Sequence, residues 1–215
     1  METSKKIPTA VYAEMTPNPA AMKFVADRAL ITGGLQIEYR SKSEAKGSSA
    51  LAEELFNFPF VTSVFISSNY VTVLKDESLG WEMIVQQLRE YIREWLMENE
   101  VAVSAVSADL VNRTRETATG NDTASKTSAT DYSSFEPTEY DDEIRFLLHE
   151  YVRPAVESDG GAIDFMAYRD KKVYVQLKGS CSGCPSSTAT LKGGIENLLK
   201  AKMPDIVEEV VAEAV

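Results

Sequence analysis

The sequence has few of the residues that bind metals or form disulfides. It contains two cysteines, Cys181 and Cys184, and one histidine, His149, among 215 residues. Two cysteines cannot form the disulfide framework of a small secreted protein. No apolar run approaches the roughly 18 residues that cross a bilayer. The start of the chain shows neither a secretory signal nor an Arg-rich transit peptide, so the expected location is the cytoplasm.

Basic residues are outnumbered, with 22 Lys and Arg against 33 Asp and Glu and a formal net charge of −11. Nucleic acids and anionic membranes both carry negative charge, so a chain this acidic is a poor candidate for binding either. The charge therefore predicts protein partners, with no nucleic acid and no membrane.

The composition changes near residue 112. The 27 residues from 112 to 138 include seven Thr and four Ser, and they contain no Leu, Ile, Val or Met. Such a segment buries too little apolar surface to offset its ordering entropy. It predicts a flexible linker between a domain over 1–111 and a domain over 139–215. The alternative is a long ordered surface loop, which is uncommon in compact domains.

Residues 1–111 carry strand and helix patterns but no obvious chemistry. Apolar and polar residues alternate over 35–39, and an apolar helical stripe runs over about 81–98. The expected order is β-β-α-β-β-α, an α+β domain with helices against one antiparallel sheet. The domain has no cysteine, histidine or phosphate-binding Gly loop, so we expect an accessory docking module. The elements expected are a segment over 11–24 whose two X-Pro steps favour extended or turn backbone, strands over 35–39, 61–66 and 70–74, and helices over 50–56 and 81–98.

Residues 139–215 predict a second small α+β domain in the order α-β-β-α-β. A helical stripe begins near residue 141, Pro154 should kink its last turn, and Gly160 and Gly161 suit its end. Alternation over 163–168 and 173–178 predicts a β-hairpin. A loop over 179–185 then leads into another helix, and 206–211 forms a last short strand.

The two cysteines lie in that loop, between the end of a strand and the start of a helix. Gly179 and Gly183 let the backbone approach whatever the thiols hold. The following helix N-terminus should lower the thiol pKa and favour thiolate, the form that binds metal. We therefore expect a Gly-rich, exposed loop that presents two reactive thiolates.

Three kinds of site fit a Cys-x-x-Cys pair, and chance is a fourth reading. A dithiol redox pair normally lies in a β-α-β unit of a larger sheet, whereas here a hairpin precedes the pair and no β-α-β crossover is expected. Zinc needs four ligands, and His149 is expected at the surface. An iron–sulfur cluster also takes four thiolates, which two chains would have to share. Ligand count alone makes any metal-bound form a symmetric dimer.

Both domains resemble a known family. The C-terminal half strongly resembles the NifU C-terminal domain of Nfu-type proteins, and the N-terminal half resembles the Nfu N-terminal domain. The first resemblance is carried by Val152–Val156, Asp159–Gly161 and Val175–Ser187, with Thr188–Ile195 and Met203-Pro204 in agreement. The second is carried by Thr16–Pro19, Lys23-Phe24 and Val61–Phe65.

The resemblance implies a function that the residue pattern alone leaves open. In this family the two cysteines bind a labile [4Fe-4S] cluster between two protomers, so Cys181 and Cys184 would be its ligands. The protein would be a homodimeric carrier, not an enzyme, that accepts a cluster from a scaffold protein and passes it to apo-proteins by thiolate exchange. Gly179, Ser180 and Gly183 would offer backbone N–H groups to the cluster sulfurs.

Overall fold

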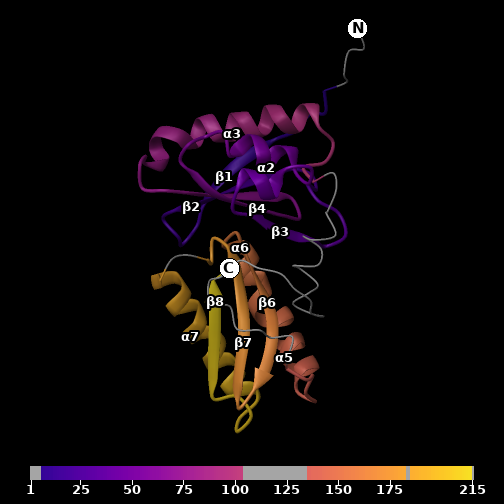
Figure 1. The fold of residues 1–215 in the computed structure, drawn as a ribbon, viewed down its shortest axis with the longest axis vertical. Helices are drawn as coiled ribbons and strands as arrows, with labels where there is room; N and C mark the ends of the chain where they lie inside the picture. The colour runs from indigo at the N-terminus through magenta and orange to yellow at the C-terminus, as the bar shows by residue number, and fades with distance from the viewer. Residues whose placement is uncertain (1–5, 104–134, 183–184, 215) are drawn as a thin grey trace.

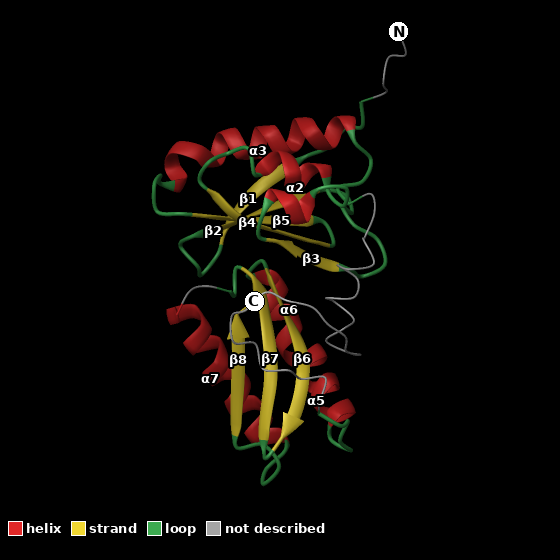
Figure 2. Ribbon diagram, in the orientation of Figure 1, coloured by secondary structure: helices red, strands yellow, loops and turns green. Residues whose placement is uncertain are grey.

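The computed structural model describes residues 6–103, 135–182 and 185–214, which form two α+β units with separate sheets (Figure 1, Figure 2). The predicted linker over 112–138 lies mostly outside these ranges. No helix of the described ranges is long and apolar enough to span a membrane.

The N-terminal unit is a five-stranded antiparallel sheet in the order β1-β2-β5-β4-β3, with helices on one face (Figure 1). The apolar stripe of α3 supplies Leu88 and Leu96, both without exposed surface, to the core between helix and sheet. The strands are β1 Val11–Met15, β2 Ala21–Ala26, β3 Gln36–Tyr39, β4 Val61–Ser67 and β5 Tyr70–Lys75, and the helices are α1 Lys42–Ala45, α2 Ala50–Leu55 and α3 Trp81–Glu98.

The structure has one strand and one short helix more than the predicted β-β-α-β-β-α order. The segment over 11–24, whose two X-Pro steps favour extended or turn backbone, forms the two strands β1 and β2, which are joined by a turn at residues 16–20. Pro17 and Pro19 lack the N–H that a central strand donates, so the ladder cannot continue through them. Asn18 closes the turn, because its Oδ1 accepts the Ala20 N–H at 2.9 Å and its carbonyl accepts the Ala21 N–H.

The C-terminal unit has a three-stranded sheet in the order β6-β7-β8. A π-helical turn, Leu148–Val152, joins α5 to α6 directly before Pro154, at the predicted kink. A proline there cannot donate to the carbonyl one turn earlier, which loosens the helix. The other elements are α5 Asp141–Leu147, α6 Arg153–Ser158, β6 Gly161–Arg169, β7 Lys172–Gly179, α7 Pro185–Lys202 and β8 Glu209–Ala214.

One topological expectation is wrong. Strand β8 pairs in parallel with β7 after the intervening helix α7, so β7-α7-β8 is a β-α-β unit. No local pattern indicates this pairing, because the direction in which the short last strand pairs depends on where α7 returns the chain. The sheet is nevertheless small, and a hairpin precedes the cysteine loop as predicted.

The two units meet where the helix-free face of the N-terminal sheet covers one end of the C-terminal unit (Figure 2). Side chains alternate along a strand, so Val25, Phe65 and Tyr70 point away from α3. They form a buried apolar cluster with Ala162 at the start of β6. The cysteine loop lies at this same end of the C-terminal unit.

Candidate cluster-binding site

The site begins with a tight turn at the end of β7. Gly179 has a φ of +64°, a conformation that side chains other than glycine rarely adopt. The Ser182 N–H donates to the Gly179 carbonyl at 3.0 Å, and the Ser182 hydroxyl donates to the same carbonyl at 2.8 Å. Thr188 in α7 donates to the Cys181 carbonyl at 3.2 Å. Strand, turn and helix therefore fix the backbone on both sides of Cys181.

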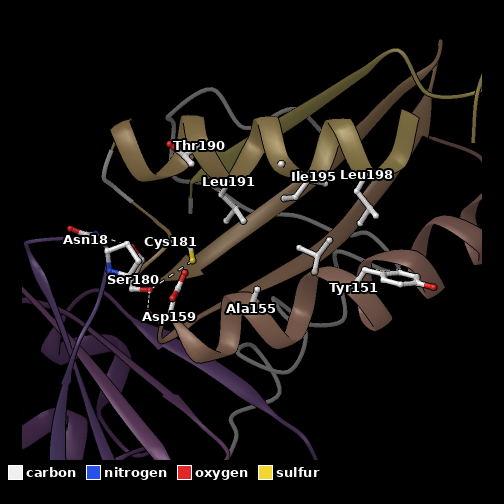
Figure 3. A pocket seen from close by; sticks show the side chains of 13 residues that line it. Asn18, Tyr151, Ala155, Asp159, Ser180, Cys181, Thr190, Leu191, Ile195 and Leu198 are labelled. Carbon is white, nitrogen blue, oxygen red and sulfur yellow. Dashed lines mark hydrogen bonds between the residues drawn. The ribbon is translucent and has the colours of Figure 1, made fainter. Parts of the chain in front are cut away.

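Cys181 points into an apolar groove between the helices α6 and α7 (Figure 3). The groove encloses about 760 Å³, and Cys181 and Asp159 lie at the end that Asn18 closes. Only 7% of the Cys181 surface is exposed, while Ser180 and Ser182 are 2% and 5% exposed. The sequence predicts an exposed loop, and this prediction is wrong for residues 180–182, which are buried.

Gly161 leaves the space that the Cys181 thiol occupies. A Cβ built at Gly161 would lie 2.6 Å from the Cys181 Sγ and 2.7 Å from the Lys178 carbonyl oxygen. Real Cβ atoms essentially never approach other atoms so closely. The sequence placed Gly161 only at the end of a helix. Gly161 also makes room for the Cys181 thiol, and this role depends on the pairing of β6 with β7, which brings Gly161 opposite Gly179.

Burial raises the pKa of the Cys181 thiol to about 11, with a smaller contribution from the negative charge of Asp159, while a hydrogen bond with Ser180 lowers it. The lowered pKa expected from the helix N-terminus is therefore wrong for Cys181. The reason is that the field of a helix end fades within a turn, and Cys181 is four residues from the first residue of α7. Cys184 directly precedes α7 but, like Gly183, lies outside the described residues, so its role as a ligand stays a prediction.

One backbone N–H group expected to face a cluster already has a partner. The Ser180 N–H donates to the Gly160 carbonyl at 3.3 Å. It would have to break this bond to reach a cluster sulfur. The expectation for Gly179 and Gly183 stays a prediction.

The N-terminal unit contributes to the site, which the sequence did not indicate. The Asn18 side-chain amide donates to the Ser180 carbonyl at 2.9 Å and to the Ser182 carbonyl at 3.3 Å. Asn18 thus holds the two carbonyls that flank Cys181, although it lies 162 residues before Ser180. Asn18 is only 3% exposed. An asparagine between two prolines indicates a turn, and nothing in its neighbourhood points to a partner in the other domain.

Glu38 of β3 also faces the loop. Its Oε1 accepts from the Ser63 hydroxyl at 3.0 Å and, more weakly, from the Ser182 hydroxyl at 3.5 Å. Its Oε2 is buried and has no hydrogen-bond partner among the described residues. Burial raises the pKa of this carboxyl group above its usual range, although Arg40, Ser63, Lys178 and the Gly179 backbone act to lower it.

The other candidate ligand does not join the site. His149 is exposed on the π-helical turn, while Cys181 is buried at the end of the groove. Within residues 6–103, 135–182 and 185–214, no three His, Cys, Asp or Glu side chains gather as a metal site would require. A zinc site built within this part of the chain therefore has no support.

Comparisons with known proteins match the two units to two families. Residues 144–211 match the family model described as "NifU-like domain", and residues 11–99 match the one described as "Scaffold protein Nfu/NifU N terminal". Each matched range contains all or nearly all of the sheet of its own unit.

Curated relatives match across both units. The chain is 33% identical over 210 residues to "NFU1 iron-sulfur cluster scaffold homolog, mitochondrial" of Drosophila willistoni, covering 95% of this chain and 64% of that protein. The protein of the same name from Drosophila persimilis is 31% identical, with 95% and 66% covered. The chain thus spans slightly less than two thirds of the length of these relatives.

Two solved structures match part of the chain with low TM-scores. A NifU-like protein from Saccharomyces cerevisiae, solved by NMR, is 23% identical with a TM-score of 0.40, covering 49% of this chain and 92% of that one. A crystal structure of a Staphylococcus aureus protein is 18% identical with a TM-score of 0.34, covering 39% and 98%. Likenesses this partial add nothing about function. The two domain matches and the relatives aligned across both units show that the chain belongs to the Nfu-type family of NifU-like proteins.

Proposed function

We propose that this protein is an iron–sulfur cluster carrier, in which Cys181 and Cys184 of two protomers hold one labile [4Fe-4S] cluster. The observation that carries the proposal is the pair of cysteines within the segment that matches the NifU-like domain. Four thiolates complete the coordination of such a cluster, and each chain supplies two. The loaded form is then a homodimer with the cluster on its two-fold axis.

The chemistry of the described half of the site fits this cargo. A cysteine thiolate is the ligand that iron–sulfur clusters take. The missing Cβ of Gly161 makes room for the Cys181 thiol at the end of the groove, and the apolar lining of the groove would restrict water around a bound cluster. The raised pKa of the thiol means that Cys181 releases its proton when iron binds, since the ligand is the thiolate.

Release follows from the small number of ligands per chain. An incoming thiolate of a client protein forms a bond to iron as the bond from iron to Cys181 or Cys184 breaks, and the freed cysteine takes up a proton. Electrons are neither gained nor lost in this exchange, and no protein acid or base is required. The partners proposed are a scaffold protein that supplies the cluster and apo-proteins that receive it.

A dithiol oxidoreductase is the alternative that one observation favours. The β7-α7-β8 unit places the cysteine pair before a helix in a β-α-β context. Such enzymes attack disulfides with an accessible thiolate of lowered pKa. Cys181 is buried and its pKa is raised to about 11, which argues against that chemistry for the first cysteine of the pair.

Anaerobic reconstitution with iron and sulfide tests the proposal. The protein should turn brown and become a dimer with about four iron atoms, as the ligand count requires. The variants Cys181→Ser and Cys184→Ser should stay colourless and monomeric while remaining folded, whereas Ser43→Ala, which removes a surface hydroxyl, should load normally. A colourless monomer that reduces disulfides catalytically would refute the carrier. Zinc without iron or sulfide in freshly purified protein would favour a zinc-bridged module instead.

The cellular location stays a prediction. The sequence predicts the cytoplasm, while the curated relatives carry the word mitochondrial in their names. Fractionation of the cells that make the protein, with a compartment marker for each fraction, decides between the two.

A further inference from the structure

We propose that the helix-free face of the N-terminal sheet is a binding surface for the cysteine loop, and that it competes for this loop with the second protomer. The inference rests on the proposed function, because competition requires two chains that share a cluster. We call this surface the cap face. It consists of side chains of β2, β4 and β5 with the turn before β2, namely Asn18, Lys23, Val25, Phe65, Tyr70 and Thr72.

The cap face recognises backbone carbonyls. Four of its side chains donate hydrogen bonds to main-chain oxygens of the C-terminal unit, and three of these side chains are less than 5% exposed. The bonds are Asn18 to Ser180 and Ser182 (2.9 and 3.3 Å), Lys23 to Ser158 (3.0 Å), Tyr70 to Gly161 (3.2 Å) and Thr72 to Gly160 (2.7 Å). The acceptors all lie within the cysteine loop or in the segment from the last residue of α6 to the first residue of β6, which supports the loop.

The shapes of the two surfaces also match. A Cβ at Gly160 would lie 2.9 Å from the Thr72 Oγ1, and one at Gly179 would lie 2.9 Å from the Phe65 Cδ1. Two glycines thus permit an approach that larger residues would prevent. The apolar cluster of Val25, Phe65, Tyr70 and Ala162 is no more than 6% exposed. Water is therefore excluded from the centre of the contact, and the bonds to its carbonyls are made in a dry surrounding.

In the closed contact, Cys181 faces the groove between α6 and α7, and Asn18 closes the end of that groove. Ser180, Cys181 and Ser182 each expose 7% of their surface or less. A cluster shared by two chains needs access to the Cys181 thiolate from the second protomer. Because Asn18 holds the carbonyls on both sides of Cys181 and closes this end of the groove, the cap face separates from the loop before the second chain reaches the thiolate from this end.

The contact carries a cost that favours opening. The Glu38 Oε2 is buried without a partner among the described residues, beside Ser182. An unpaired buried polar atom loses its hydration and gains no bond in return. Separation of the two surfaces returns this oxygen to water. The closed form is thus a reversible cover over the thiol.

Alkylation of a single cysteine tests the cap face without any cluster. In the full chain carrying Cys184→Ser, iodoacetamide reports the exposure of Cys181 alone. Asn18→Asp keeps an oxygen for the Ala20 N–H but removes the donor to both loop carbonyls. It should speed alkylation about tenfold, the effect of losing one to two buried hydrogen bonds. Asn57→Asp adds the same charge at an exposed position away from the cap face and should leave the rate unchanged.

A second variant guards against misfolding. Thr72→Val keeps the shape of the side chain and removes only the donor to the Gly160 carbonyl. It should also speed alkylation, by a smaller factor than Asn18→Asp. Alkylation at the parent rate in both variants, with both folded by circular dichroism, would overturn the proposal that the cap face covers the loop.

Cluster loading tests the competition. With both cysteines present, Asn18→Asp should form the loaded dimer faster than the parent chain under the same reconstitution conditions, and Asn57→Asp should match the parent. Equal or slower dimer formation by Asn18→Asp would overturn the competition. If neither parent nor variant takes a cluster, the proposed function fails and the competition with it. The alkylation rates then still decide whether the cap face binds the loop.

Discussion

Replacing Gly161 by alanine should destabilise the C-terminal unit by about 2 kcal/mol. The added methyl group would lie 2.6 Å from the Cys181 sulfur and 2.7 Å from the Lys178 carbonyl oxygen. The sulfur can rotate away, but the carbonyl belongs to β7, which is paired with β6 along its whole length. The strands must therefore separate slightly, and such overpacking costs about 1–3 kcal/mol.

The matched control is another glycine of the same unit. Nothing lies within 4 Å of a Cβ built at Gly193, which is exposed in the middle of α7. Gly193→Ala should stabilise the unit by about 0.5–1 kcal/mol, because glycine is a poor helix former. The two substitutions are chemically identical and have opposite expected signs, so a general effect of adding a methyl group cannot explain the difference.

Thermal unfolding followed by circular dichroism measures both effects. For a unit of this size, 1 kcal/mol shifts the Tm by about 4–8 °C. Gly161→Ala should therefore lower the transition of the C-terminal unit by about 8–16 °C, and Gly193→Ala should raise it by a few degrees. Both tryptophans, Trp81 and Trp95, lie in the N-terminal unit, so their fluorescence follows that unit separately. An unchanged or raised Tm for Gly161→Ala would refute the steric argument.

Two further predictions concern the N-terminal unit. Leu88 has no exposed surface in the core beneath α3, so Leu88→Ala should cost about 2–5 kcal/mol in urea unfolding followed by tryptophan fluorescence; a cost near that of the exposed control Gln87→Ala would contradict this core. Burial raises the pKa of Glu38, so the folded chain holds its proton more tightly than the unfolded chain, whose glutamates titrate near pH ~4.3. The contribution of protonated Glu38 to the free energy of unfolding is present below that pH and is lost as the pH rises through the pKa of Glu38 in the folded chain. Glu38→Gln should remove this pH-dependent loss of stability. Identical profiles of stability against pH for the parent and Glu38→Gln would contradict the raised pKa of Glu38.

Local patterns predicted the elements whose signals lie within one stretch of sequence. The stripe over 81–98 became α3 with the same bounds, and Ser49 caps α2 by accepting the Ala52 N–H at 3.1 Å. The α+β class of both units was predicted correctly, because amphipathic periodicity is set by neighbouring residues. The matches to both domains also confirm the family that the cysteine loop and its flanking residues indicated.

Features that depend on distant residues were missed. The parallel pairing of β8 depends on the path of α7, and the burial of Cys181 depends on its own groove and on the turn between β1 and β2. The helix-end argument gave the wrong direction for the Cys181 pKa, because desolvation exceeds the field of a helix that starts four residues later. No local signal could link Asn18 to the Ser180 carbonyl, which lies 162 residues later in the sequence.

Native mass spectrometry of mixed chains tests the central claim most directly. Unlabelled and ¹⁵N-labelled protein are mixed before anaerobic reconstitution, and the species are weighed before and after addition of an apo acceptor. The account predicts dimers of mixed label that each carry one [4Fe-4S] cluster, and label-free and labelled monomers without iron after transfer. Clusters carried by monomers, or loaded dimers that keep their cluster in the presence of acceptor, would contradict a carrier that shares its cargo between two chains.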